Sequence, residues 1–430
     1  MNVKKKACLK SDDFKEILKK ELEKIKLNDE AKKEIIKISE DFRKKLEKAI
    51  GEDVFIGGSL AKNTLIKKNF YDIDIFIRFL KPDSNKKAGS AKVEDNLEKA
   101  LKKMKVKFLR VHGSRDYFQV KNKNMVFEVI PVKKIKNPKE AENITDLSFF
   151  HVSYVSGKLK DKKIADEIML AKAFCHAIGC YGAESYIQGF SGYALELLMI
   201  HFKSFLNFLK AITRSKEKII IDSSRFYKNR QEILISLNEA KLSSPIIVID
   251  PTYKERNATA ALSQETFDRF KEKAKEFLKK PDLRFFENKK IDKNQLEKEA
   301  KKRKAELIEF QASTDRQEGD IAGSKLRKFF KFVGNQLAKY YDILREEFVY
   351  SGKHEANYYF IARKKKEIIM NGPYVNDVIN SDKFRKEHKK SFEKSGKLYS
   401  KEKPDISKIK IYNSLKKHCK EMSVVSLKLD

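Results

Sequence analysis

Residues 54–80 read VFIGGSLAKNTLIKKNFYDIDIFIRFL, and this stretch decides the fold class of the N-terminal part of the chain. Successive side chains of a β-strand point to opposite faces, so in the segment after residue 70 Asp72 and Asp74 share one face. The other face carries Ile73, Ile75, Ile77 and Phe79. The apolar face predicts a buried core, and the opposite face then holds two carboxylates a few ångströms apart.

Two carboxylates held this close repel each other, and a half-buried pair needs a cation. Oxygen-rich clusters suit Mg²⁺, which usually also takes water and substrate phosphate. Residues 125–132 predict another apolar strand, and it contains a single acid, Glu128. If the two strands are neighbours, Glu128 completes a three-carboxylate site of the kind that holds two metal ions in phosphoryl transfer. Gly57-Gly58-Ser59 predicts a tight turn whose N–H groups and hydroxyl meet a triphosphate.

Each of these signals also has a plainer interpretation. An Asp-x-Asp pair on a strand is usually a solvated face, and a lone Glu128 among apolar residues is often the partner of a lysine. The order of the signals is more specific than any one of them. Gly-Ser, about a dozen residues, Asp-x-Asp at the start of a strand and an acid in a later strand occur here in that sequence.

The rest of the chain predicts several domains, because 430 residues are too many for one ordinary domain. Strand and helix alternate in the first 140 residues, which favours an α/β or α+β domain. The predicted helices cover 12–50, 93–104, much of 164–209, 267–278 and 325–346, and the further strands 246–249, 305–310, 348–350 and 358–362. Residues 82–90 predict a loop, and residues 287–304 a linker or an exposed helix.

Charge and composition narrow the class of protein. Lys and Arg number 95 against 62 Asp and Glu, a formal net charge of +33, which favours a polyanionic partner, although lysine as surface filler is an equal interpretation. No run of 18 apolar residues and no secretory signal is present, so we expect no membrane association. The four cysteines lack metal-ligand spacing, and a reducing, cytoplasmic setting is the default.

The ordered motifs match the nucleotidyltransferase superfamily of the polymerase beta-like enzymes, and several are closer still to one family within it. Residues 58–64 with 72–76, Asp-Leu-Ser-Phe-Phe-His at 146–151, Tyr-Gly-Ala-Glu at 181–184 and Gly-Phe-Ser-Gly-Tyr at 189–193 resemble the archaeal (class I) CCA-adding enzymes. Further matches are Glu196-Leu197, Asp250-Pro251, Arg256-Asn257-Ala258, Leu262-Ser263, Asn371-Gly372-Pro373 and residues 384–388. The resemblance runs in order over nearly the whole chain.

The resemblance implies an α+β multidomain enzyme. It has a polymerase beta-like catalytic domain at 1–145, a helical central nucleotide-binding domain at 146–284 and an α+β tRNA-binding module at 285–430. The family adds C, C and A from CTP and ATP to the 3′ end of immature or damaged tRNA without a template, using Mg²⁺. The partner is then the tRNA acceptor arm. The family often forms homodimers, but the sequence shows no interface signature.

Carried over by position, the resemblance assigns roles to eleven residues. The catalytic, metal-binding acids are Asp72, Asp74 and Glu128, with Glu128 where the family usually has Asp. The nucleotide-binding residues are Ser59, Lys62, Ser148, His151, Lys172, Tyr181, Asp250 and Arg256, the last two in the region that reads the base edge. An Arg fork suits two acceptors on a base, and a lysine suits phosphate.

Three other functions remain open at this point. The chain could be a partial enzyme that adds only C or only A, or a template-independent nucleotidyltransferase with another acceptor, such as an RNA tail or an antibiotic. It could also be a tRNA-binding protein whose site has decayed. The presence of all three acids counts against decay.

Overall fold

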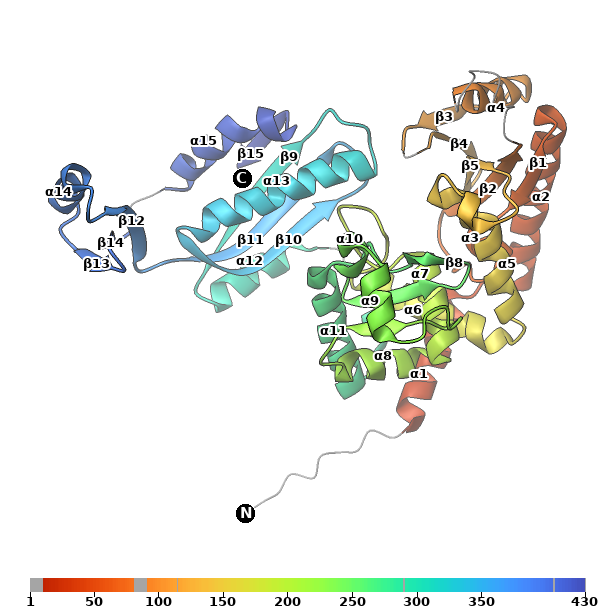
Figure 1. Cartoon of the computed structure of the whole chain (residues 1–430), viewed down its shortest axis with the longest axis horizontal. Helices are drawn as coiled ribbons and strands as arrows, with labels where there is room; N and C mark the ends of the chain where they lie inside the picture. Colours follow the sequence, from red (N-terminus) through yellow and green to blue (C-terminus); the bar gives the residue numbers. More distant parts are fainter. Residues whose placement is uncertain (1–10, 81–90, 114, 289–290, 405–406, 430) are drawn as a thin grey trace, which may run out of the picture. The chain divides into compact units, whose positions relative to one another are not determined.

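The computed structural model describes residues 11–80, 91–113, 115–288, 291–404 and 407–429 (Figure 1). The chain divides into two compact units, residues 1–183 with 187–289, and residues 184–186 with 290–430. The division into three domains at residues 145 and 284 therefore stays a prediction. The predicted loop at 82–90 lies outside the described residues.

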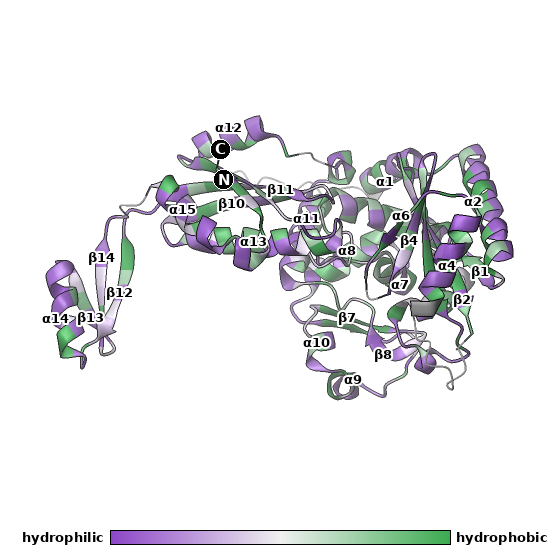
Figure 2. Cartoon of the chain, turned by 90° about the horizontal axis from the view of Figure 1, so that it is seen from above, coloured by the Kyte–Doolittle hydropathy of each residue, from purple (hydrophilic) through white to green (hydrophobic). Residues whose placement is uncertain are grey.

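The first unit begins with a five-stranded sheet that buries one face. The strand order is β1-β2-β5-β4-β3, in which only β2 and β5 are parallel. The strands are β1 Asp53–Ile56, β2 Tyr71–Phe79, β3 Phe108–Val111, β4 Tyr117–Asn122 and β5 Met125–Lys133. Helices α2 (Asp29–Ile50) and α4 (Ala91–Lys103) share a core with this sheet, and Phe42 stacks on Phe127 at 4.3 Å between ring centroids. In Figure 2, α2 alternates between hydrophilic and hydrophobic residues, as a helix half in the core must.

The prediction of one helix over residues 12–50 is wrong. The chain forms α1 (Ser11–Ile25) and α2, with a break at residues 26–28. The Asn28 side chain accepts a hydrogen bond from the Ala31 N–H, 2.8 Å, and so caps the start of α2. As a result α1 packs with the helical part of the unit, whereas α2 packs on the sheet.

The helical part of the first unit surrounds two nearly fully buried helices, α6 (Lys162–Ala177) and α7 (Gly192–Phe202). Other helices here are α5 Ser148–Lys158, α8 Phe205–Arg214, α9 Arg230–Ser236, α10 Glu239–Leu242 and α11 Gln264–Lys279, with the short turns η1 Pro138–Glu140, η2 Ile144–Leu147 and η3 Leu283–Phe286. A small sheet has the order β6-β7-β8, with β6 Ile219–Ile221, β7 Ile246–Asp250 and β8 Tyr253–Asn257. No helix in the described part of the chain is both long enough and apolar enough to cross a membrane.

The second unit contains a four-stranded sheet of order β10-β11-β9-β15. The strands are β9 Glu306–Ser313, β10 Tyr341–Tyr350, β11 Glu355–Lys364 and β15 Ser426–Leu429. Helices α13 (Asp320–Ala338) and α15 (Lys408–His418) share one core with the sheet, and α12 (Lys293–Lys302) shares a second. A smaller sheet of β12 Ile368–Tyr374, β14 Lys397–Glu402 and β13 Ser391–Lys394 carries α14 (Val378–Glu387); η4 is Lys420–Met422.

One prediction for the second unit needs correction. The expected helix at 325–346 ends at Ala338, because residues 341–350 form β10, paired along its length with β11. Helical periodicity continued into a segment whose Tyr341 and Ile343 are also good strand residues. The stretch predicted as a linker or exposed helix contains α12, whose Leu296 and Ala300 are buried. Residues 184–186 belong to this unit through Ser185, whose N–H donates to Asp320 Oδ1 at 2.7 Å.

The packing of aromatic rings in the helical core predicts how much a cavity there would lower the free energy of unfolding. Phe174 on α6 is fully buried and contacts the rings of Phe205, Phe270, Phe277, Phe285 and Phe286. Phe174→Ala should lower the free energy of unfolding by about 3–5 kcal/mol, because it leaves a cavity among close-packed rings. Guanidinium unfolding of the full chain measures this change. Ile235→Ala, at a side chain that is 84% exposed, is the control and should leave the transition midpoint nearly unchanged.

Candidate active site

The three predicted acids lie on the face of the first sheet that α2 and α4 leave uncovered. In the parallel pairing of β2 with β5, Asp74 is the register partner of Glu128 and Asp72 that of Val126. Asp72 is exposed and Asp74 half-buried. Glu128 Oε1 accepts a hydrogen bond from Gln119 Nε2 on β4, 3.0 Å. Within the described ranges, no group of three or more His, Cys, Asp and Glu side chains is arranged so that it could hold a metal ion as it stands.

The Gly57-Gly58 turn, which directly follows β1, contacts Asp74 on β2. The Gly57 N–H donates to the Asp74 carbonyl oxygen at 2.8 Å. Gly58 has a positive φ of 59°, and a Cβ there would lie 1.7 Å from Asp74 Oδ2. Instead of the predicted tight turn, residues 58–61 form the single helical turn α3 (Gly58–Ala61), which contains the half-buried Ser59. Any side chain at residue 58 would displace the carboxylate, so this contact requires glycine.

Burial acts on the Asp74 carboxyl more strongly than its charged neighbours do. It raises the pKa of Asp74 to about 6, Lys62 and Lys172 oppose that rise, and Asp72 adds to it. The same acids affect Tyr117 on β4, whose pKa is raised to about 12 by burial first and then by Glu128 and Asp72. The carboxylates therefore form one electrostatic cluster that lacks enough positive charge of its own.

Lys62 and Lys172 are buried next to this cluster and share one carboxylate. Glu196 on α7 receives Lys62 Nζ on Oε2 at 2.6 Å and Lys172 Nζ on Oε1 at 3.0 Å. Lys172 Nζ also donates to Thr64 Oγ1 at 2.9 Å. Burial lowers the pKa of Lys172, and Glu196 opposes that shift. Burial alone would raise the pKa of Glu196, but the two lysines outweigh it and the pKa lies below the usual value.

Asp250 at the end of β7 is the centre of a second cluster. Its Oδ2 lies 2.9 Å from His151 Nε2 and accepts from Arg256 Nη1 at 2.6 Å. Its Oδ1 accepts from Tyr193 Oη at 2.9 Å and from the Thr252 N–H at 2.8 Å. These contacts, with a further one from the Thr252 hydroxyl, use the whole carboxylate. Burial would raise the pKa of Asp250, but His151 and Arg256 hold it well below the usual value.

Tyr193 connects the two clusters. Its ring stacks on His151 with centroids 4.0 Å apart, and Lys62 Nζ lies 5.9 Å from its centroid. Arg256 lies 5.4 Å from the same ring. Burial lowers the pKa of His151, and Asp250 partly offsets that effect. His151 is therefore held by both its neighbours in a fixed orientation.

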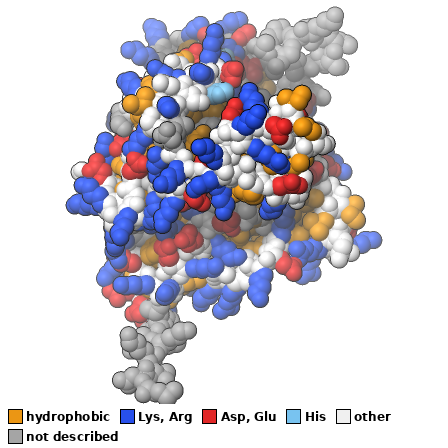
Figure 3. All heavy atoms as spheres, turned by 90° about the vertical axis from the view of Figure 1, so that its left-hand side faces the viewer, with side chains coloured by type: hydrophobic (Ala, Val, Ile, Leu, Met, Phe, Trp, Pro, Cys, Tyr) orange, Lys and Arg blue, Asp and Glu red, His pale blue; other side chains and the backbone are white. Residues whose placement is uncertain are grey.

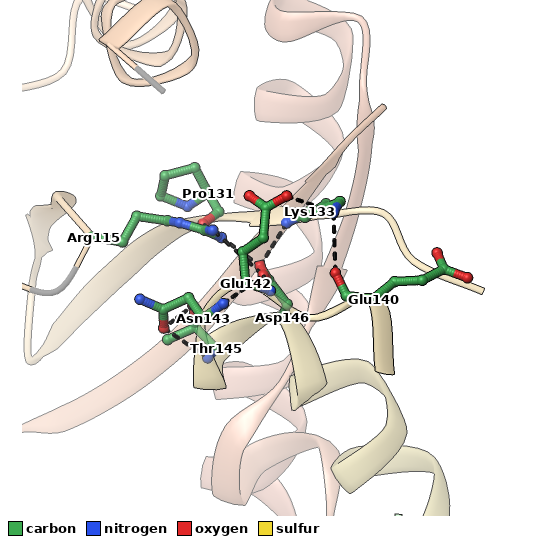
Figure 4. Close-up of polar contacts among 8 residues, drawn as sticks. All are labelled: Arg115, Pro131, Lys133, Glu140, Glu142, Asn143, Thr145 and Asp146. Atoms are coloured by element: carbon green, nitrogen blue, oxygen red, sulfur yellow. Dashed lines mark hydrogen bonds and ion pairs between the residues drawn. The ribbon is translucent and has the colours of Figure 1, made fainter. Parts of the chain in front are cut away.

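Asp146, at the end of η2, fixes the start of α5, which contains Ser148 and His151 (Figure 4). The buried Asp146 carboxylate accepts hydrogen bonds from the Arg115 guanidinium and from the backbone N–H of Lys133, 2.7 Å, and Asn143, 3.0 Å. Burial would raise the pKa of Asp146, but Arg115 and these N–H groups lower it below its usual value. The first turn of α5 is thereby tied to the end of β5, which also contains Glu128.

Tyr181 and Lys172 both lie next to Gly192. Its ring stacks on His176 with centroids 3.8 Å apart, and burial, with help from Lys68 and Lys172, lowers the pKa of His176 to about 3. A Cβ at Gly192 would lie 2.9 Å from Tyr181 Oη and 3.9 Å from Lys172 Nζ. Gly192 therefore leaves room for the phenol and the ammonium side by side.

The predicted residues thus fall into groups that adjoin one another. Asp74, Lys62 and Lys172 interact electrostatically, Tyr181 adjoins Lys172, and His151, Asp250 and Arg256 form the second cluster. Among the described residues, no side-chain hydrogen bond joins Ser59 or Ser148 to these groups. Four residues that hold the site together had no role predicted from the sequence: Thr64, Arg115, Tyr193 and Glu196. Tyr193 and Glu196 are three residues apart on α7, and that helical spacing was the available signal.

Known proteins match this chain over most of its length. Residues 166–287 match the family model described as tRNA nucleotidyltransferase, second domain. The CCA-adding enzyme of Nanoarchaeum equitans is 33% identical over 351 residues, which span 81% of this chain and 83% of that protein. The chain belongs to the family of CCA-adding enzymes. Another CCA-adding enzyme, from Pyrococcus abyssi, is 33% identical over 278 residues, 63% of this chain and 60% of that protein.

Solved structures support the fold class. The Cid1 poly(U) polymerase, in a structure with Mg 3′-dATP bound, has a TM-score of 0.50 at 12% identity and covers 65% of this chain and 100% of its own. At this identity the similarity concerns the fold alone. The family and the α+β nucleotidyltransferase fold predicted from the motifs are confirmed. CCA-adding enzymes are nucleotidyltransferases, so this member is one by descent.

The hydrogen bonds of Asp146 predict a contribution to stability that depends on pH. Asp146→Asn should lower the free energy of unfolding near neutral pH by about 1.5–3 kcal/mol, because the charged acceptor of several donors is lost. The pKa of Asp146 is depressed in the folded state, so its contribution is present above the unfolded value and disappears as pH falls through the folded value. The difference from the unmodified chain should therefore shrink below about pH 4.

Guanidinium midpoints at neutral and acidic pH test this expectation. Asp268→Asn on α11, an exposed acid that accepts a hydrogen bond from Gln264, is the matched control. An Asp146→Asn loss that is the same at both pH values would show that the charge of Asp146 contributes nothing.

Proposed function

We propose that this chain adds C, C and A from CTP and ATP to the 3′ end of immature or damaged tRNA without a template and releases pyrophosphate. One observation supports it most directly. This member of the CCA-adding family has two acids, Asp74 and Glu128, in register on one sheet face, with two buried lysines beside them. Those groups match the needs of nucleotidyl transfer, which asks a protein mainly to position a triphosphate and neutralise its charge.

The acids suit a hard divalent cation. Asp72, Asp74 and Glu128 offer only carboxylate oxygens, and burial of Asp74 leaves its charge poorly compensated. These three residues would hold Mg²⁺, with Gly58 leaving space next to Asp74. When bound, Mg²⁺ would supply charge neutralisation for the α-phosphate and the leaving pyrophosphate. Glu128, opposite Asp74 on the neighbouring strand β5, would accept the proton of the attacking 3′-hydroxyl.

The phosphate-binding side chains surround the acids. Lys62 and Lys172 would bind the triphosphate as point charges, and the Ser59 hydroxyl and Tyr181 phenol would donate hydrogen bonds to it. His151 would contribute a further donor from the first turns of α5, and Ser148 another at its N-terminus. Lys62, Lys172 and His151 are held by Glu196 and Asp250 before nucleotide arrives, which lowers the entropic cost of orientation.

Arg256 would recognise the base edge of the nucleotide, and Asp250 would hold the Arg256 side chain in position. Nη1 of the Arg256 fork is engaged with Asp250, and the buried Nε has no hydrogen-bond partner among the residues that the structure describes. Because the Asp250 carboxylate is already saturated, we assign it to holding Arg256 and His151 rather than to contacting the base. The unsatisfied Nε donor is then available to a base acceptor, which removes the cost of leaving it unpaired.

The tRNA partner would be recognised by shape and phosphate. The chain carries a net charge of +33, and Figure 3 shows Lys and Arg side chains spread over much of the face that it presents. Dispersed basic groups suit the backbone of an A-form helix more than a base sequence. Tyr341 and Tyr358 in the C-terminal part are buried and belong to the core, so neither would stack on a base. The cytoplasmic location and the homodimer stay predictions.

Asp74→Ala should abolish nucleotide incorporation and leave tRNA binding within about threefold, because the acid serves the reaction and not the RNA. The assay uses tRNA transcripts that end before CCA, after C and after CC, with labelled CTP and ATP singly and together, and reads product length on a gel. The unmodified chain should stop after CCA. Addition of only C or only A would indicate a partial enzyme, and a long tail another acceptor class. Asp268→Asn again serves as control; incorporation by Asp74→Ala would exclude the assigned site.

Arg256→Lys should weaken discrimination among nucleotides more than it slows the reaction. Lysine keeps the charge near Asp250 but loses the planar fork, so the ratio of kcat/KM for CTP and ATP over UTP should fall about tenfold or more. Steady-state kinetics with each nucleotide on the appropriate transcript measures that ratio. An unchanged ratio would assign base selection to other groups.

A further inference from the structure

Glu196 lies in the site, but no step of the proposed reaction uses its carboxylate. It is 1% exposed on the buried helix α7, and both of its oxygens are engaged, Oε2 by Lys62 and Oε1 by Lys172. The Thr64 hydroxyl, fully buried, lies 3.4 Å from Oε1 and accepts from Lys172. These four side chains come from the loop after α3, from α6 and from α7, and we call them the lysine clamp.

Burying the charged side chains of the lysine clamp costs more free energy than packing the same interior with apolar residues. Lys62 and Lys172 are only 8% and 4% exposed, and both contact the same carboxylate. Removing ions from water costs more than one pair returns, and apolar residues of similar size usually pack at least as well. The buried charges are therefore retained at a cost to stability. Buried ammonium groups are of use where a polyanion enters, because charges interact strongly in a poorly solvated site.

The position of the clamp links it to the rest of the site. Asp74 feels the charges of Lys62, Lys172 and Glu196, so the clamp borders the acids. One turn earlier on α7, Tyr193 donates to Asp250 and stacks on His151. One helix face thus holds the phosphate-binding lysines through Glu196 and the base-reading cluster through Tyr193.

We propose that Glu196 is a positioning residue for the triphosphate: it keeps both lysines in place before nucleotide binds and shares them with the polyphosphate afterwards. The inference rests on the proposed function, since it assigns the polyphosphate as the ligand. Without Glu196, two like charges would lie close together with no counter-charge between them. They would then move apart into whatever solvent they could reach, and the affinity for the triphosphate would fall.

The test separates positioning from mere stability. Glu196→Gln keeps the size and removes the charge, and Glu196→Asp keeps the charge. Glu196→Gln should raise KM for both CTP and ATP about tenfold or more while kcat changes less than threefold. Glu196→Asp should recover most of that loss. The Kd for tRNA should stay the same in both, because the clamp does not serve the RNA.

A control and a binding measurement make the result decisive. Glu167→Gln on α6 alters a half-buried glutamate that accepts from the Phe205 N–H at 2.6 Å and touches neither lysine, so it should leave KM unchanged. Calorimetry with inorganic tripolyphosphate gives affinity without turnover, and Glu196→Gln should weaken it in parallel with KM. Thermal melting identifies a variant that fails to fold; if Glu196→Gln does, Glu196→Asp, whose shorter carboxylate still offsets part of the charge of the two lysines, is measured instead and should bind tripolyphosphate more weakly than the unmodified chain does.

The two proposals fail in different ways. If the unmodified chain incorporates nucleotide and Glu196→Gln keeps its KM and its tripolyphosphate affinity, the positioning role is wrong and the function stands. Equal KM losses in Glu196→Gln and Glu167→Gln would also overturn it, because a structural defect alone then explains the loss. If the unmodified chain incorporates nothing on any transcript, the proposed function fails, whatever the tripolyphosphate measurement gives.

Discussion

The burial of one face of β2 is the constraint on which the rest of the site depends. Ile73, Ile75 and Ile77 are fully buried, so the register of the strand is fixed. A slip of one residue would turn Asp72 and Asp74 into the core and three isoleucines into solvent. Because the period of a strand is two, apolar burial on one side is what holds the carboxylates on the other. The parallel pairing with β5 then brings Glu128 opposite Asp74.

The site around these acids is assembled by charge pairs that are held away from water. Glu196 and Asp250 each gather two basic or potentially basic partners, and each belongs to a buried element of the helical part. Such pairs are poor contributors to stability when they are buried, but they orient side chains with little freedom left. We interpret their presence as preorganisation: stability is given up in exchange for a site whose donors already point at the nucleotide.

The strongest sequence signals predicted the structure well, and the failures have physical causes. Strands β2, β5 and β7 were predicted because their apolar runs are bounded by turn residues. Strands β3 and β4 were missed, since 4 and 6 residues are too few for an alternating pattern to stand out from the flanking loops. The helix break at Asn28 and the end of α13 at Ala338 were missed because periodicity continues across both. Capping and strand pairing, not hydrophobic pattern, decide those boundaries.

The sequence by itself determined the family, the fold class and the residue types available for nucleotidyl transfer, because ordered motifs and strand alternation are local properties. Only the tertiary structure decided that Lys62 and Lys172 share the Glu196 carboxylate, and that Asp250 is saturated by the chain's own donors. Those contacts join residues as far as 134 positions apart in the chain. No local pattern encodes such a pairing, since it depends on which buried helices and loops pack against one another.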